Sequence, residues 1–245
     1  LPISMGSLRR SNLLFDHSDA EAAATREGEQ EVLSVLQEIC ALADVRPETP
    51  RLYSRLVYAL RKLDTRALSA MHTRVEREAV CQANNVMAKE FFHDAIPSVS
   101  TAASAALMRE LIEAGELSET DADIWLTSMA FTAQPSSDMI REISPLLRRP
   151  APSKKMFLTI STLVNSYCRQ ADDCEYNRDI QQVLEVISAN LGYNCRESDN
   201  EKVLMTLKAL GNTGLHVQAV PILNRCMANT ELPMETRVAA IEAYR

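Results

Sequence analysis

The stretch "KALGNTGLHVQAVPIL", Lys208 to Leu223, runs from a helix-forming segment through two glycines into a second apolar segment. A phosphate-binding loop would follow a β-strand and carry a Lys-Ser/Thr pair or a Gly-x-Gly-x-x-Gly pattern. Here the apolar residues before the glycines recur at helical spacing: Val203, Leu204, Leu207 and Leu210. We therefore predict that Gly211, Asn212 and Gly214 end one helix and turn the chain into the next, without binding a ligand.

The composition of the whole chain agrees with a helical protein. Its 245 residues include only six glycines, which disfavours a sheet with many tight turns and a set of glycine-rich nucleotide loops. A net charge of −7 argues against wholesale nucleic-acid binding, because neutralising phosphates requires a basic face. No uncharged apolar run approaches 18 residues, so the sequence predicts no transmembrane segment.

Short amphipathic segments follow one another along the chain, and several begin or end at recognisable signals. Thr49 is a predicted N-cap with Pro50 at the first helical position, and Ser100 or Thr101 opens a later helix. That later helix is predicted to stop at Gly115, and a capping signal starts the next helix at Ser118. The pattern predicts eleven or twelve helices of about 10 to 20 residues with connectors of about 2 to 8 residues.

The succession of helix pairs resembles a degenerate helical solenoid, in which each pair buries its face against the next pair. A compact helical bundle is the alternative. The segment "SNLLFD" (residues 11–16) has the composition of a short strand and is interpreted as the tail of a preceding β domain. Because the chain also begins without Met, we expect it to be a segment of a longer protein.

The cysteines and histidines suggest no metal site of the zinc-finger type. None of the six cysteines forms a Cys-x-x-Cys motif, and the four histidines are scattered. The polar segment "CRQADDC" (residues 168–174) suits a small loop closed by a disulfide, which implies an oxidising compartment. Reduced thiols in a cytosolic helical protein fit the composition equally well.

Catalytic residues are not evident either. His93 and Asp94 are neighbours in "FFHDAIP", but adjacent residues on a helix point about 100° apart and do not face one another. Trp125 lies in an apolar helical segment and is interpreted as a buried anchor. We expect no enzymatic activity.

Three stretches resemble the helical domain of the large lipid transfer proteins, the family of vitellogenins, apolipoprotein B, apolipophorins and the large subunit of microsomal triglyceride transfer protein. They are "GSLRRSNLLFDHSDAEAAA", "FFHDAIPSVSTAASAALMRELIEAGELSETDADIWLTSMAF" and "LMTLKALGNTGLHVQAVPIL" followed by "METRVAAIEAYR". Val99-Ser100-Thr101 departs from the family's usual glycine turn. The resemblance covers essentially the whole chain in order.

Two further stretches look closest to the apolipophorin and apolipoprotein B side of the family: "VRPETPRLYSRLVYALRKLD" and "SYCRQADDC". Vitellogenins share the two-cysteine loop and stay open as the nearer relatives.

The resemblance implies an all-α, double-layered right-handed α-solenoid spanning residues 19–245, with more of the chain following it. Residues 1–18 would be the end of a preceding β-barrel or a linker. The resemblance also implies two disulfides, Cys168 with Cys174 and Cys195 with Cys226. Cys40 and Cys81 have no counterpart in it, so they are expected either to be free or to pair with each other.

The function implied by the resemblance is that of a non-catalytic helical domain of a secreted lipid-transport protein, exported through the endoplasmic reticulum lumen. Its implied partners are lipids, phospholipid or neutral lipid, carried as cargo without any other cofactor, and flanking β-sheet domains of the same protein. A receptor or a protein disulfide isomerase is a further candidate partner. The alternative is a cytosolic helical-repeat scaffold for protein–protein interaction.

Overall fold

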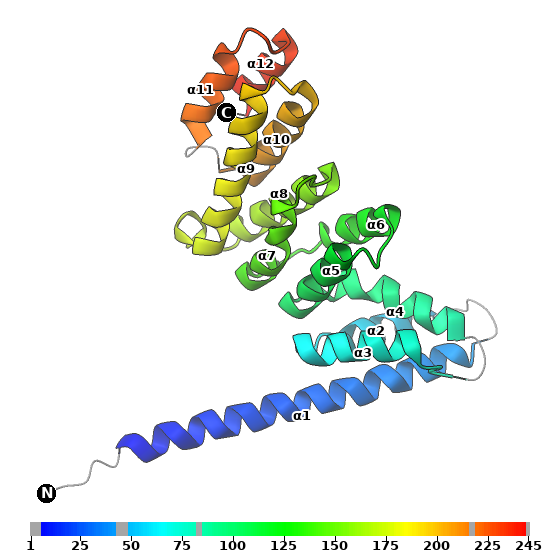
Figure 1. The fold of residues 1–245 in the computed structure, drawn as a ribbon. Helices are drawn as coiled ribbons and strands as arrows, with labels where there is room; N and C mark the ends of the chain where they lie inside the picture. The colour runs from blue at the N-terminus through cyan, green and yellow to red at the C-terminus, as the bar shows by residue number, and fades with distance from the viewer. Residues whose placement is uncertain (1–5, 43–48, 82–84, 216–218, 244–245) are drawn as a thin grey trace, which may run out of the picture. The chain divides into compact units, whose positions relative to one another are not determined.

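The computed structural model describes the backbone of residues 6–42, 49–81, 85–215 and 219–243, and the side chains from residue 20 onward. Within these ranges the chain forms twelve α-helices and two short 3-10 helices, and no β-strand (Figure 1). The predicted all-α class is confirmed. Across the described residues, no helix combines the length and the apolar character needed to cross a membrane.

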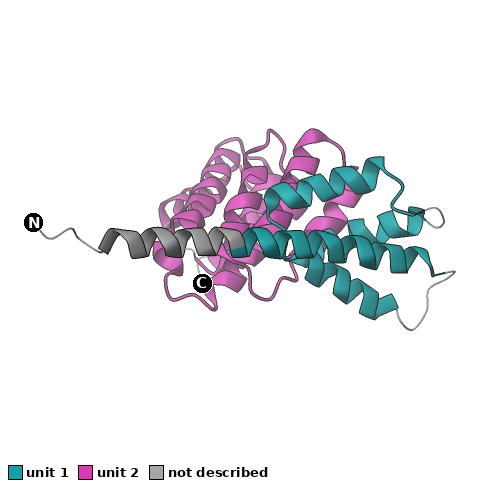
Figure 2. Ribbon diagram, turned by 90° about the horizontal axis from the view of Figure 1, so that it is seen from below, with its two compact units in different colours: residues 1–99 teal, residues 100–245 magenta. Residues whose placement is uncertain are grey.

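The chain divides into two compact units, residues 1–99 and residues 100–245, coloured separately in Figure 2. The first unit contains α1 (Gly6–Cys40), α2 (Thr49–Leu60), α3 (Thr65–Arg77) and α4 (Asn85–Val99). The second contains α5 (Ala102–Ala114), α6 (Glu119–Met129), α7 (Ser137–Ile143), η1 (Ser144–Arg148), α8 (Lys154–Cys168), η2 (Cys174–Tyr176), α9 (Arg178–Arg196), α10 (Asn200–Thr213), α11 (Val220–Ala228) and α12 (Met234–Glu242). The solenoid arrangement and the domain boundary after residue 18 stay predictions.

The predicted N-terminal strand is wrong, because residues 11–16 lie within α1. The apolar run in "SNLLFD" is too short to distinguish a strand from a helical segment by its periodicity. The Ala- and Glu-rich sequence that follows it favours a helix strongly, and α1 extends through both segments.

In the first unit, α1 packs against α2 and α4, and α2 packs against α4. The contacting side chains that have no exposed surface include Val32, Leu36, Leu56, Leu60, Phe92 and Ile96. Gly28 of α1 lies directly against the end of α2. A Cβ at this position would lie 2.8 Å from Cβ of Lys62 and 3.1 Å from the carbonyl oxygen of Ala59. The absence of a side chain at Gly28 therefore lets the two helices approach closely.

In the second unit, several helices begin and end where the sequence predicts. The side chain of Thr101 accepts a hydrogen bond from the backbone N–H of Ser104, and Ser104 Oγ accepts one from the N–H of Thr101, a capping box. Ser118 is the N-cap of α6, and its side chain accepts a hydrogen bond from the backbone N–H of Asp121. Gly115, with φ of 71°, ends α5 in the left-handed conformation.

The core of the second unit is built by the contacts of α5 with α7, of α6 with α8, and of α10 with both α8 and α9. Trp125 of α6 is only 4% exposed, which confirms its predicted role as a buried anchor. Side chains without exposed surface include Leu126, Ile140, Phe157, Ile160, Ile187 and Val203. Each of these helices buries one face against its neighbours.

The predicted turn at "GNTG" begins later than the sequence suggested. Gly211 and Asn212 are helical, α10 continues to Thr213, and only Gly214 adopts the left-handed conformation, with φ of 69°. The helix persists because Leu210 is buried in the core and the Thr213 hydroxyl donates to its carbonyl oxygen. The predicted start of the following helix at residues 216–218 lies outside the described residues.

We predict that Gly28→Ala lowers the free energy of unfolding. The added methyl group overlaps Lys62 and the backbone of Ala59, and overpacking of this kind costs roughly 1–3 kcal/mol. The better helix propensity of alanine returns only about 1 kcal/mol of that loss. Urea unfolding followed by circular dichroism measures the difference. A variant as stable as the wild type would show that α1 and α2 do not approach this closely.

We predict opposite effects for alanine at the two glycines of "GNTG". Gly214→Ala places a side chain in the left-handed region and is expected to destabilise by about 1–2 kcal/mol. Gly211→Ala has no atom within 4 Å of the new methyl group, and alanine in a helix is expected to stabilise by up to about 1 kcal/mol. The same unfolding assay separates the two variants, and a loss of stability at both would contradict the observed helix end.

Candidate functional site

The sequence directs attention to the disulfide-linked helices of the second unit. Cys195, near the end of α9, and Cys226 of α11 form a disulfide with their Cα atoms 5.4 Å apart. Both side chains are buried. Because α10 lies between them in the sequence, the bond closes a covalent loop around α10 and its Gly214 cap.

Backbone and side-chain hydrogen bonds support the same corner. The side-chain Nδ2 of Asn229 donates to the carbonyl oxygen of Cys195 over 2.6 Å and to the hydroxyl of Ser198 over 3.2 Å. Ser198 has φ of 54°, a left-handed conformation that turns the chain between α9 and α10. The segment after α11 is therefore fastened to the end of α9 beside the disulfide.

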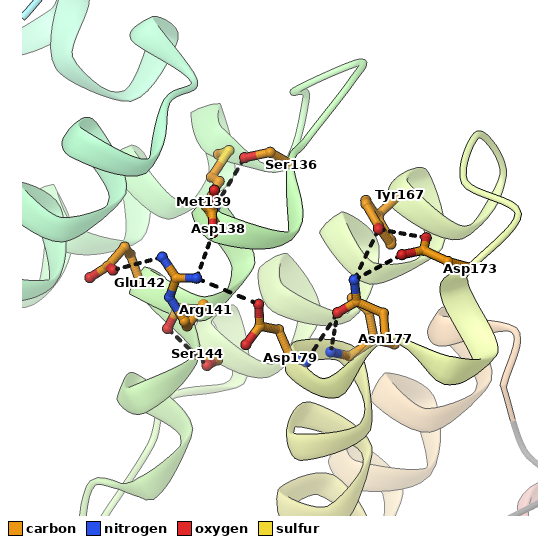
Figure 3. Close-up of polar contacts among 11 residues, drawn as sticks. Ser136, Asp138, Met139, Arg141, Glu142, Ser144, Tyr167, Asp173, Asn177 and Asp179 are labelled. Carbon is orange, nitrogen blue, oxygen red and sulfur yellow. Dashed lines mark hydrogen bonds and ion pairs between the residues drawn. The ribbon is translucent and has the colours of Figure 1, made fainter. Parts of the chain in front are cut away.

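The second predicted pair, Cys168 and Cys174, closes a small loop between α8 and η2, with Cα atoms 5.0 Å apart. Polar contacts hold this loop (Figure 3). The hydroxyl of Tyr167 donates to Asp173 over 2.8 Å, and the amide of Asn177 donates to both residues. The hydrogen bonds from Tyr167 and Asn177 place the pKa of the Asp173 carboxyl below its usual value.

Asn177 also fixes the start of α9, because its side-chain oxygen accepts from the backbone N–H groups of Asp179 and Ile180. Next to this cap, Arg141 of α7 lies 2.5 Å from Asp138 and 3.8 Å from Asp179 (Figure 3). The two-cysteine loop, the α9 cap and the α7–α9 ion pair thus form one continuous polar region.

Cys40 and Cys81, which the sequence left either free or paired, form a third disulfide in the first unit, with Cα atoms 6.3 Å apart. The bond joins the end of α1 to the segment after α3. Their separation of 41 residues carries no local pattern. The signal available in the sequence is the even number of cysteines. Once the other four are paired, Cys40 and Cys81 are left to pair with each other.

His93 and Asp94 do not act together in the structure. Nε2 of His93 lies 2.7 Å from Glu76 Oε1, whereas the carbonyl oxygen of Asp94 accepts a hydrogen bond from Tyr53. Burial, with a contribution from the nearby charge of Glu90, raises the pKa of the Asp94 carboxyl. The helix geometry that argued against a His93–Asp94 pair holds.

A groove of about 740 Å³ opens beside the turn between α9 and α10, lined by the segment before α8, the first turn of α8, the last turns of α9, and α10. Tyr193 and Leu204 are 57% and 39% exposed and contribute apolar surface. Lys202 and Asp199 form an ion pair of 2.9 Å on its lining. A surface that combines aromatic and aliphatic groups with a charged border has the composition of a protein–protein interface.

Comparisons with known proteins agree on one family. A family model described as the vitellogenin TPR domain matches residues 26–245. Vitellogenin of Penaeus merguiensis is 24% identical over 253 residues, which cover 99% of this chain and 10% of that protein. Apolipophorins of Locusta migratoria are 27% identical over 195 residues, covering 79% of this chain and 6% of that protein.

A solved structure described as "lipid-protein interactions in lipovitellin" has a similar fold, with a TM-score of 0.72 at 20% identity. The similarity covers 89% of this chain and 23% of that chain. The chain spans about a tenth or less of the length of the Penaeus vitellogenin and the Locusta apolipophorins. Since the family model covers nearly all of its described helices, this chain belongs to the vitellogenin TPR domain family.

Proposed function

We propose that this chain is the non-catalytic helical domain of a secreted lipid-transport protein. The observation that carries the proposal is the match of residues 26–245 to the vitellogenin TPR domain. Relatives named vitellogenin and apolipophorins, and the fold shared with lipovitellin, support it. In this role the domain supports a cavity in which phospholipid or neutral lipid is held by apolar burial, at roughly 25 cal/mol per Å².

The three disulfides support a route through an oxidising compartment, since disulfides persist in secreted proteins and are rare in the cytosol. Each disulfide joins a different pair of segments: the end of α1 to the segment after α3, the end of α8 to η2, and α9 to α11. Such cross-links stabilise chiefly by restricting the unfolded chain, by roughly 2–4 kcal/mol each. A protein disulfide isomerase is a fitting partner during their formation.

We propose that the groove beside Tyr193 and the exposed face of α12 contact the flanking domains of the same protein. Met234, Val238 and Ile241 of α12 are 78%, 41% and 44% exposed and recur at i, i+4 and i+7. They therefore lie on one face of the helix. Apolar residues grouped in this way are characteristic of surfaces covered by another part of a protein.

We predict that the chain contains no free thiol. The thiols of the secreted protein are titrated in denaturant without reductant, and peptide mapping assigns each reactive thiol to its position in the chain. All six cysteines of residues 1–245 should be found oxidised. Six titrating thiols would contradict the secreted assignment and favour the cytosolic scaffold. Reduction before titration supplies the positive control.

We predict that the double variant Tyr193→Ser with Leu204→Ser, made in the full-length protein, lowers the amount secreted with bound lipid several-fold. The substitutions remove apolar contact from the groove, and a loss of about 1–2 kcal/mol at such a contact changes abundance several-fold. Lipid extraction and protein quantification of the culture medium measure the effect.

The matched control is Tyr176→Ser with Ile124→Ser, which removes one exposed tyrosine and one exposed aliphatic side chain outside the groove. This control is expected to match the wild type. Equal secretion and equal lipid content in both double variants would contradict the proposed contact at the groove.

A further inference from the structure

The groove beside the turn between α9 and α10 contains an amide group that the other described residues leave unpaired. Asn194 of α9 lines this groove, and its side chain is only 4% exposed. Within the described residues no hydrogen bond links its amide to another group, although every fully enclosed side-chain nitrogen or oxygen there has a partner. The amide of Asn194 therefore faces the open space of the groove. Because a buried amide is unfavourable unless it is hydrogen-bonded, its position favours a ligand that pairs with it.

A second asparagine lies one helical turn away on the same face of α9. Asn190 also lines the groove, and residues four apart project from one side of a helix. Four residues of an α-helix span about 6.0 Å along its axis. Two residues of an extended peptide span a similar length, about 6.4–6.8 Å. The two asparagines are therefore spaced to meet alternate residues of an extended peptide that runs along α9.

An asparagine side chain carries the same donor and acceptor groups as a peptide bond. Its nitrogen can donate to a backbone carbonyl oxygen while its oxygen accepts from a backbone N–H. Asn194 can form both hydrogen bonds. Nδ2 of Asn190 already donates to the carbonyl oxygen of Val186 over 2.9 Å, so Asn190 can add one more bond through Oδ1. Contacts of this kind recognise an extended backbone, and the neighbouring side chains then provide specificity.

The charged residues of the groove determine which segment it prefers. Lys154 of α8 and Lys208 of α10 line it, and neither forms an ion pair with a carboxylate of the described residues. Lys202 already pairs with Asp199 over 2.9 Å, and Glu201 is the remaining carboxylate of the lining. The two lysines therefore outnumber the remaining carboxylate, although the whole chain has a net charge of −7. This local excess of positive charge favours an acidic segment.

We infer that the groove binds an extended, acidic segment of the same polypeptide that lies outside residues 1–245. The inference rests on the proposed contact between this groove and the flanking domains, and it adds the conformation and the charge of the segment. Tyr193 and Leu204 supply apolar surface for its other side chains. The source is the rest of the polypeptide, since this chain corresponds to 10% and 6% of the two relatives and such a protein has most of its length elsewhere.

The experiment places a photo-crosslinking residue in the groove of the full-length secreted protein. Tyr193, which is 57% exposed, is replaced by p-benzoylphenylalanine, so that an aromatic side chain is retained. After illumination, proteolysis and mass spectrometry identify the segment that lies against it. We expect one segment from outside residues 1–245 of the same polypeptide, with acidic residues close to the crosslinked position.

Further substitutions, each combined with the crosslinker, test the chemistry of binding. Lys154→Gln and Lys208→Gln each remove one positive charge and should lower the crosslink yield about twofold or more. Asn194→Leu removes the amide with little change in size and should lower the yield about fivefold. Lys155→Gln is the matched control, because Lys155 is the exposed neighbour of Lys154 but does not line the groove. It should leave the yield unchanged.

The two lysine variants keep the test decisive if Asn194→Leu fails to fold. Lys154 and Lys208 are exposed, so replacing their charges with an amide leaves the core intact. Circular dichroism of each secreted variant checks its helix content before the yields are compared.

A crosslink to another protein, to lipid or to a second copy, recognised by its doubled mass, would overturn the inference. The absence of any crosslink, or a crosslink to a segment without acidic residues, would overturn it as well. So would equal yields in Lys154→Gln, Lys208→Gln and Lys155→Gln, since the charge of the groove would then have no effect.

Lipid extraction from the same preparations separates this inference from the proposed function. Protein that carries lipid but gives no crosslink to an acidic segment would contradict the inference alone. Protein that gives the expected crosslink but carries no lipid would contradict the lipid-transport function alone.

Discussion

A helix of twelve residues such as α2 is marginal by itself in water, and burial of one face against α1 and α4 is what makes it stable here. Leu56, Ala59 and Leu60 of α2 have no exposed surface. The same holds through the second unit, where Phe157 and Ile160 of α8 are fully buried. Loss of the contact between neighbouring helices would thus remove the reason for each helix to form.

This constraint explains why so much of the secondary structure could be predicted from sequence. A helix that buries one face must repeat apolar residues every three or four positions, and it must satisfy its first N–H groups. Thr101 and Ser118 provide such caps, and Gly115 provides the left-handed residue that ends α5. Each of these signals depends only on residues close together in the sequence, so it can be recognised without knowledge of the fold.

The errors occurred where local signals are ambiguous. Residues 11–16 resemble a strand when considered alone, yet they belong to α1. Gly211 can either end a helix or be tolerated inside one, at a cost of about 1 kcal/mol. Burial of Leu210 and the hydrogen bond from Thr213 decide for the helix, and neither is visible without the fold.

The sites depend on contacts between distant residues, so they were the least predictable. The Cys40–Cys81 bond spans 41 residues. His93 has Asp94 as its neighbour in sequence, but its partner is Glu76 on another helix. The family resemblance supplied the two other cysteine pairs, which the residues alone did not.

The Cys195–Cys226 bond has a consequence for the integrity of the chain. Any single peptide bond broken between these cysteines leaves the two fragments covalently joined, with α10 still buried against α8 and α9. A protease that cuts once between Cys195 and Cys226 would therefore produce a nicked molecule whose mass differs from that of the intact chain by one added water. Only reduction of the disulfide would separate the two fragments. The chain can therefore be cut between the two cysteines while the fragments stay joined.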